Sequence, residues 1–173
     1  MRYVLPSEMP STFDAEALKA QAVCARTFVY SQMKNTQYAL YGANIDNTTA
    51  FQVYNASETK QSTDEAVKAT AGQVVSCGRS LITCYYFSTS AGKTEDMEVW
   101  SSSTPDFIHK VESVDDNSPY YRWTSELDLS AYNDPQYGTA TGVSVDKTSD
   151  VGYVLSLTIN YGNKSQTFTA END

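Results

Sequence analysis

The sequence predicts an α+β fold, in which one long alanine-rich helix and a shorter helix pack with antiparallel strands around an open substrate groove. Three observations favour this class. Small and aliphatic side chains repeat at helical spacing near the start of the chain, a second short helical segment follows, and strand-like segments separated by turns make up the remainder.

The long helix is expected over residues 14–34. The side chains that recur there at helical spacing are small or aliphatic: Ala15, Leu18, Ala22, Ala25 and Val29. A helix with so small a face can approach its neighbours closely, so we expect it at the centre of the fold. Pro10 and residues 11–14 supply an entry turn and candidate N-cap side chains. Residues 1–4 are expected to form a strand that leads into this turn.

The shorter helix is expected at residues 63–71. Ser62 and Glu65 have the spacing of a capping box, in which each side chain bonds the other residue's backbone N–H. Gly72 stands where a C-terminal cap belongs.

Two strands, Gln73–Cys77 and Leu81–Phe87, are expected next, joined by a turn at Gly78–Ser80. Residues 88–121 are polar and rich in Ser, Asp and Pro, which is typical of long functional loops. Residues 122–169 have the pattern of strands separated by turns. The expected turns are Asn133–Pro135, Asp150–Gly152 and Gly162–Asn163.

Composition narrows the class of protein. The 173 residues are enough for one domain, and we expect a single domain over residues 1–173 that is truncated at both ends relative to a longer parent protein. The formal net charge of −9 argues against a nucleic-acid partner. Three cysteines without a CxxC pair do not indicate a disulfide framework. In the expected hairpin Cys77 faces Ser80 or Leu81 and not Cys84, so we expect three free thiols.

Among the residue types present, carboxylates are the best candidates for catalysis. His109 is the only histidine, and no nucleophile elbow or glycine-rich phosphate loop accompanies it. Carboxylates suit the cleavage of a glycosidic bond, where one acid protonates the leaving oxygen. Glu8 is the first carboxylate to consider because Pro6 and Pro10 make its segment rigid. The alternative is an ordinary acidic residue in a turn before a helix.

An ordered set of motifs over residues 3–123 resembles the SpoIID/LytB family. The matching segments are Val4–Pro10, Glu16–Val23, Ala25–Phe28, Thr48–Thr49, Gln52–Tyr54, Ala66–Thr70, Gly72–Val74, Tyr85–Glu95, Val99–Trp100 and Ser118–Trp123. The resemblance implies an exported or membrane-anchored protein that faces the cell wall, with peptidoglycan glycan strands as substrate and no cofactor. It also suggests a cell-wall amidase or sporulation engulfment proteins as partners. A membrane anchor would belong to the parent protein only.

The resemblance implies that Glu8 is catalytic, in a lytic transglycosylase that cleaves the MurNAc–GlcNAc bond and leaves 1,6-anhydro-MurNAc ends. Glu8 would act first as general acid and then as base toward the C6 hydroxyl of the muramic residue. Three alternatives stay open. The chain could be a LytB-like glycan-binding enhancer of an amidase, a wall-binding module, or a hydrolase with Glu95 as a second carboxylate.

Further site residues follow from the matching motifs. Lys19, Gln21 and Arg26 lie on the expected long helix and are expected to hold glycan or orient Glu8. Lys19 and Arg26 are seven residues apart, so they would form a cationic strip on one face. Gln52 and Tyr54 are candidate groove residues. A second set comes from the later motif: Tyr86 and Ser88 on one side of a strand, Ser90 beyond them, and Glu95 at the family's second acidic position.

Three aromatic residues are further candidates for the site, and the sequence departs from the family pattern at two places. Trp100, Tyr120 and Trp123 are either sugar-stacking platforms or core residues. Some members carry Cys and His around the segment matched by residues 44–51, but Asp46, Ala50 and Phe51 stand at those places here, so no zinc site is expected. Ser90-Ala91-Gly92 replaces the common Ser-Gly-Gly turn, which raises the question of whether position 91 needs a positive φ.

Overall fold

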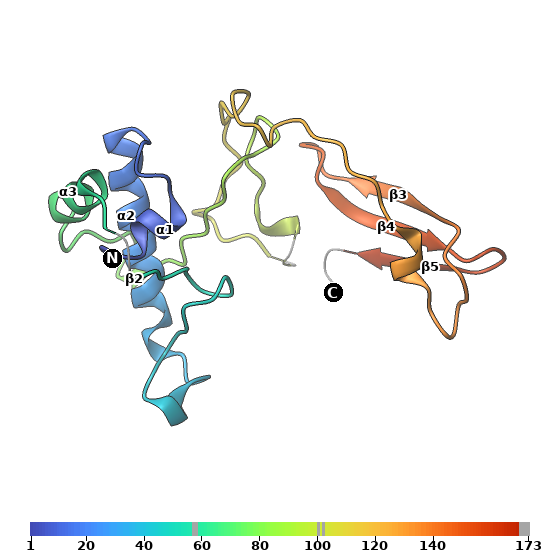
Figure 1. The fold of residues 1–173 in the computed structure, drawn as a ribbon, viewed down its shortest axis with the longest axis horizontal. Coiled ribbons are helices and arrows are strands. Elements are labelled where there is room, and N and C mark those ends of the chain that lie inside the picture. The colour runs from blue at the N-terminus through green and yellow to red at the C-terminus, as the bar shows by residue number, and fades with distance from the viewer. Residues whose placement is uncertain (57–58, 100, 102, 170–173) are drawn as a thin grey trace. The chain divides into compact units, whose positions relative to one another are not determined.

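The computed structural model describes residues 1–56, 59–99, 101 and 103–169, which form two compact units, Met1–Tyr86 and Phe87–Asp173 (Figure 1). The first contains helices α1, α2 and α3 with a short hairpin, and the second contains a three-stranded antiparallel sheet. The α+β class is therefore confirmed, while the single domain expected over residues 1–173 stays a prediction.

Helix α2 (Ala15–Ser31) forms the centre of the first unit, as its small side chains predict (Figure 1). The Asp14 carboxylate caps the helix by accepting a hydrogen bond from the backbone N–H of Glu16 at 2.9 Å. Leu18, Ala22 and Ala25 are buried, whereas Ala15 in the first turn is exposed. A 3₁₀ turn, η1 (Gln32–Lys34), extends the helix to the end that the periodicity predicts.

The segment before α2 differs from the expectation. Residues 1–4 are not a strand but a turn that leads into a one-turn helix, α1 (Leu5–Glu8). Pro6 is compatible with this helix because it lies in the first turn, where a backbone N–H has no intrahelical acceptor. Leu5 is fully buried against Leu18 and Ala22 of α2 and Ala66 of α3. This burial stabilises a helix that is too short to form by itself.

Helix α3 (Gln61–Ala69) begins and ends two residues before the expected bounds. The capping box was a wrong prediction. Lys60 occupies the N-cap position, and the Ser62 hydroxyl donates a hydrogen bond to the carbonyl of Ser11 at 2.7 Å. Thr70 and not Gly72 occupies the C-cap position, and Gly72 follows two residues later in a turn with φ +75°.

The hairpin after α3 has the expected register but shorter strands. β1 (Ser76–Cys77) pairs with β2 (Ser80–Leu81), and Cys77 faces Ser80 as predicted. β2 ends at Leu81 and residues 82–87 continue as irregular backbone, so the strand expected up to Phe87 is wrong beyond its first residue. All three cysteines are free thiols, as expected.

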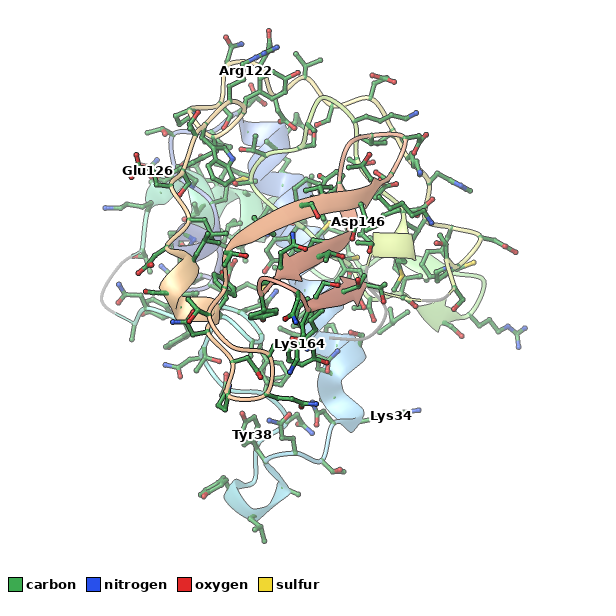
Figure 2. All side chains as sticks on the ribbon, turned by 90° about the vertical axis from the view of Figure 1, so that its right-hand side faces the viewer. Lys34, Tyr38, Arg122, Glu126, Asp146 and Lys164 are labelled. Atoms are coloured by element: carbon green, nitrogen blue, oxygen red, sulfur yellow. The ribbon has the colours of Figure 1, made fainter. Side chains whose placement is uncertain are left out.

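The second unit is built on the sheet β3 (Gly142–Thr148), β4 (Val154–Asn160) and β5 (Ser165–Thr169), which are hydrogen-bonded in that order. Their two connections contain the turns predicted around Asp150–Gly152 and Gly162–Asn163. Ala140, Ile159 and Tyr161 form a small buried core in this unit. Figure 2 labels Asp146 on β3, whose carboxylate accepts a hydrogen bond from Thr158 of β4 at 2.6 Å.

Short 3₁₀ turns complete the fold: η2 (Ala39–Tyr41), η3 (Met97–Val99) and η4 (Leu129–Tyr132). The polar segment 88–121 is held together by turns and by an isolated bridge between Lys93 and Glu112. Among the described residues, no helix has both the length and the apolar character needed to cross a membrane.

Candidate active site

Glu8 is the last residue of α1 and borders a pocket of about 310 Å³ in the first unit. Residues distant in the sequence line this pocket, among them Phe28, Phe51, Val53, Cys84 and Tyr86. The backbone N–H of Val53 donates a hydrogen bond to Oε1 of Glu8 at 2.5 Å. The buried side chain of Leu5 holds α1 against α2 and α3, so the helix that carries Glu8 is fixed at both ends.

Tyr86 is the second polar group at the pocket, and the Glu8 carboxylate is near enough to affect the pKa of its phenol. Burial, followed by the nearby negative charge of Glu8, raises the pKa of Tyr86 to about 12. The phenol therefore stays protonated at neutral pH and can donate its proton to the Glu8 carboxylate in a hydrogen bond.

Gln52 holds the hydroxyl of Tyr86 by a hydrogen bond. Its side chain is 3 % exposed, and its Nε2 donates to the backbone carbonyl of Ala25 at 3.2 Å and to the hydroxyl of Tyr86 at 3.1 Å. Hydrogen bonds thus run from α2 through Gln52 to Tyr86, which lines the same pocket as Glu8. The structure brings together three of the residues selected from the sequence.

Lys19 and Arg26 do not form the expected cationic strip. Lys19 makes an exposed ion pair with Glu16 at 2.6 Å. Arg26 is 8 % exposed, and its guanidinium donates to the carbonyl of Gln73 at 2.9 Å and, at 3.4 Å, to the carbonyl of Val67. Arg26 therefore satisfies acceptors at the C-terminal end of α3, a position where a cation is favourable.

Gln21 is also buried on α2, and its Nε2 has no hydrogen-bond partner among the described residues. Tyr54 is largely exposed and packs edge-to-face on Tyr3, with ring centroids 5.6 Å apart. Both residues lie in the first unit, but neither lines the Glu8 pocket.

Glu95 lies in the second unit and is buried in an ion-pair network. Lys110 Nζ is 2.7 Å from its Oε1 and 2.6 Å from Oδ1 of Asp150. Burial by itself raises the pKa of Glu95, but the hydrogen bonds from Lys110, Ser149 and the backbone of Asp96 hold it below its usual value. This geometry agrees with a network residue, and the catalytic alternative for Glu95 stays a prediction.

Ser90 is buried in the same unit, and its N–H and hydroxyl both donate to Oδ2 of Asp115, at 2.8 and 2.5 Å. The expected alternation of Tyr86 and Ser88 along a strand is wrong, because β2 ends before these residues. Ser88 is exposed. Ala91 has a negative φ while Gly92 has φ +96°, so alanine is compatible with position 91.

Of the three aromatic candidates, two lie in the described part of the chain. Trp123 is 74 % exposed and Tyr120 is also exposed, so neither is a core residue. Trp100 lies outside the described residues. Asp46, at the place of the zinc ligands in some family members, accepts hydrogen bonds from Tyr38 at 2.6 Å and from Thr48. In the described part of the chain no cluster of three metal-ligating side chains occurs.

Two contributors to these sites were missed by the sequence reasoning. The Val53 N–H is a backbone group, and no residue pattern identifies such a donor. Lys110 follows the lone histidine in a polar loop, and no local signal pairs it with Glu95.

Comparison with known proteins gives one matching family model and three relatives. Residues 1–76 match the family model SpoIID, described as stage II sporulation protein. The chain is 43 % identical over 128 residues to the amidase enhancer of Bacillus subtilis (strain 168), covering 73 % of this chain and 17 % of that protein. It is 35 % identical over 171 residues to stage II sporulation protein D of the same organism, covering 90 % of this chain and 48 % of the relative. The corresponding protein of Bacillus amyloliquefaciens is 32 % identical over 171 residues, with the same coverage. The chain thus spans less than half the length of each of these relatives.

Proposed function

Because this chain belongs to the SpoIID family, we propose that it is a peptidoglycan lytic transglycosylase with Glu8 as its catalytic acid and base. The observation that carries the proposal is the position of Glu8 at a pocket, where the Val53 N–H binds its carboxylate and Tyr86, held by Gln52, lines the same pocket. We further propose that the protein acts outside the cytoplasm, on the glycan strands of the cell wall.

In the proposed reaction Glu8 gives its proton to the glycosidic oxygen as the bond to C1 of MurNAc breaks. The C6 hydroxyl of the same sugar then attacks C1, which closes the 1,6-anhydro ring, and gives its proton to the Glu8 carboxylate. The acid is thereby restored without a water molecule. One carboxyl group is sufficient because the nucleophile belongs to the substrate.

The neighbours of Glu8 support both halves of this cycle. After the first proton transfer Glu8 is an anion, and the Val53 N–H and Tyr86 hydroxyl are positioned to stabilise it. A carboxylate has about four lone-pair sites, so two donors leave acceptor capacity for the C6 hydroxyl. Hydrolysis has less support, because Glu95 is already engaged by Lys110.

The test is mass spectrometry of peptide-free glycan strands incubated with the protein, with Glu8→Gln and with Glu65→Gln. Glu65 is an exposed acid on α3, so its variant controls for the loss of one negative charge in the same unit. We expect anhydro-muramic ends from the wild type and Glu65→Gln, and none from Glu8→Gln. Reducing ends in place of anhydro ends would show hydrolysis, and undiminished cleavage by Glu8→Gln would remove Glu8 from the mechanism.

The second candidate function is enhancement of a cell-wall amidase without glycan cleavage. The similarity to the amidase enhancer favours it, because that relative has the highest identity of the three compared above. The same variants separate the two functions. An enhancer should accelerate amidase release of stem peptides equally well as wild type and as Glu8→Gln, with no new glycan ends in either case.

A further inference from the structure

The backbone donor of the candidate active site lies at the end of the long loop that follows η1. The N–H of Val53 donates to Glu8, and Phe51 lines the Glu8 pocket. Gln52, between them, binds the hydroxyl of Tyr86. Three consecutive residues thus serve the same pocket, and the path of the backbone through them decides whether the N–H reaches the acid.

The Asp46 carboxylate organises the turn that leads into this segment. Its Oδ1 accepts hydrogen bonds from the backbone N–H and the hydroxyl of Thr48, at 2.8 and 2.7 Å. The carbonyl of Thr48 accepts a bond from the N–H of Phe51 at 3.1 Å, and its hydroxyl accepts one from the N–H of Ala50 at 3.3 Å. The turn therefore sets the direction in which the chain enters residues 51–53.

The other carboxylate oxygen of Asp46 connects this turn to an earlier part of the loop. Oδ2 accepts a hydrogen bond at 2.6 Å from the hydroxyl of Tyr38, which lies just before η2 and is labelled in Figure 2. The ring of Tyr38 also packs edge-to-face on Phe51, with centroids 6.1 Å apart. The Asn44 side chain donates to the carbonyl of Met33 in η1 at 3.0 Å, which attaches the loop to the helix before it.

Given the proposed function of Glu8, on which this inference rests, we propose that Asp46 is a positioning residue that holds the Val53 N–H at the Glu8 carboxylate. Asp46 is not among the residues that line the pocket, so it acts through the backbone of residues 48–53. Once Glu8 has given its proton to the glycan, the Val53 N–H stabilises the resulting anion. Loss of the Asp46 turn lets this donor move, and the transition state loses a fixed partner.

The second unit contains a turn of the same kind, which provides a matched control. Asp128 accepts hydrogen bonds from the N–H and the hydroxyl of Ser130 at 2.9 and 2.7 Å, as Asp46 does from Thr48. Asp128→Ala therefore removes one acid and one such turn but leaves the loop before Val53 intact. Asp46→Asn is the conservative variant, because its amide oxygen is able to accept the same bonds from Thr48.

The first experiment measures hydrogen exchange of the Val53 amide by NMR in the wild type and in these three variants. Exchange reports whether the N–H stays bound, and it requires no substrate. We expect Asp46→Ala to exchange roughly tenfold faster at Val53, with Asp46→Asn and Asp128→Ala within about twofold of the wild type. The Val75 amide, which is bound by the Thr27 hydroxyl at 2.9 Å in the same unit, should not change in any variant.

The second experiment measures the formation of anhydro-muramic ends from peptide-free glycan strands. Asp46→Ala should lower kcat roughly fivefold or more and change KM less than about twofold, and Asp46→Asn should recover most of the loss. The proposal is overturned by unchanged Val53 exchange in Asp46→Ala, by equal acceleration at Val53 and Val75, or by an effect on KM alone. If the wild type releases no glycan ends, the proposed function fails, while exchange still decides whether Asp46 holds the N–H. The two failures are therefore distinguishable.

Discussion

Replacing Arg26 by alanine should destabilise the first unit rather than weaken glycan binding. Arg26 and Lys19 share a helix and a charge, but only Arg26 is buried. Its guanidinium binds the carbonyls of Val67 and Gln73 and the hydroxyl of Thr70, all at or just after the end of α3. Removing it leaves these acceptors without their donor inside the protein.

The magnitude follows from these contacts. A hydrogen bond from a charged donor contributes roughly 1.5–3 kcal/mol, and the bond to Gln73 at 2.9 Å has good geometry. The two contacts at 3.4 Å are long and add less. With the lost packing of the aliphatic stem, we expect Arg26→Ala to cost about 3 kcal/mol. At roughly 2 kcal/mol per molar urea, the unfolding midpoint would fall by about 1.5 M.

Urea unfolding followed by far-ultraviolet circular dichroism is the appropriate assay. The α-helices of the described chain all lie in the first unit, so their signal reports this unit. Both tryptophans come after Tyr86, so fluorescence reports the second unit separately. Lys19→Ala is the control, because an exposed ion pair is worth less than about 1 kcal/mol.

An unchanged midpoint for Arg26→Ala together with a large loss of glycan affinity would refute this reasoning. It would mean that the guanidinium leaves α3 to bind substrate. Arg26→Met gives a second check, because it keeps the stem and removes only the donors. We expect it to recover part of the stability lost in Arg26→Ala, with the remaining loss coming from the unsatisfied carbonyls.

Three other predictions concern the two sites and one turn. Tyr86→Phe should lower glycan cleavage roughly tenfold or more with the fold intact, since it removes a hydroxyl from the pocket beside Glu8 that could stabilise its anion. Gly92→Ala should lower the thermal stability of the second unit, since position 92 has φ +96° and a Cβ there would lie 3.2 Å from a tyrosine hydroxyl. Glu95 has a lowered pKa, so its ion pair with Lys110 should stabilise the second unit above about pH 4.5 and lose this effect as the pH falls through the folded value. Lys110→Met should therefore reduce the acid sensitivity of tryptophan fluorescence.

Each of these has an outcome that would contradict it. Full activity in Tyr86→Phe would leave Val53 as sufficient support for Glu8. Ala91→Gly is the control for the turn, and a loss of stability there equal to that of Gly92→Ala would show that positive φ is not the cause. An acid transition in Lys110→Met that matches the wild type would assign the acid sensitivity to another carboxylate, for which Asp115 is the next candidate.

Local signals in the sequence predicted α2 well, because its periodicity and its Asp14 cap do not depend on distant residues. They failed for α1, since Pro6 and Pro10 indicated a turn while the actual stabilisation comes from the burial of Leu5. The capping box at Ser62 failed for a similar reason: the backbone of Ser11 offers its hydroxyl a tertiary acceptor.

The contacts of the site residues could not be predicted for the same reason: local sequence patterns do not show which distant residues pack together. The spacing of Lys19 and Arg26 correctly places both on α2, but it contains no information on which neighbour covers each side chain. Gln52 and Tyr86 were selected by family resemblance, and the structure gives the physical link between them. Their bond joins residues 34 positions apart, which no periodicity predicts.

The hydrogen bond from Val53 to Glu8 has a consequence for mutational scanning. Its donor is a main-chain amide, which every amino acid except proline provides. An alanine scan would therefore report position 53 as tolerant, although its N–H is 2.5 Å from the proposed acid. Only proline at that position would remove the contact, so the importance of this segment has to be measured through the backbone and not through its side chains.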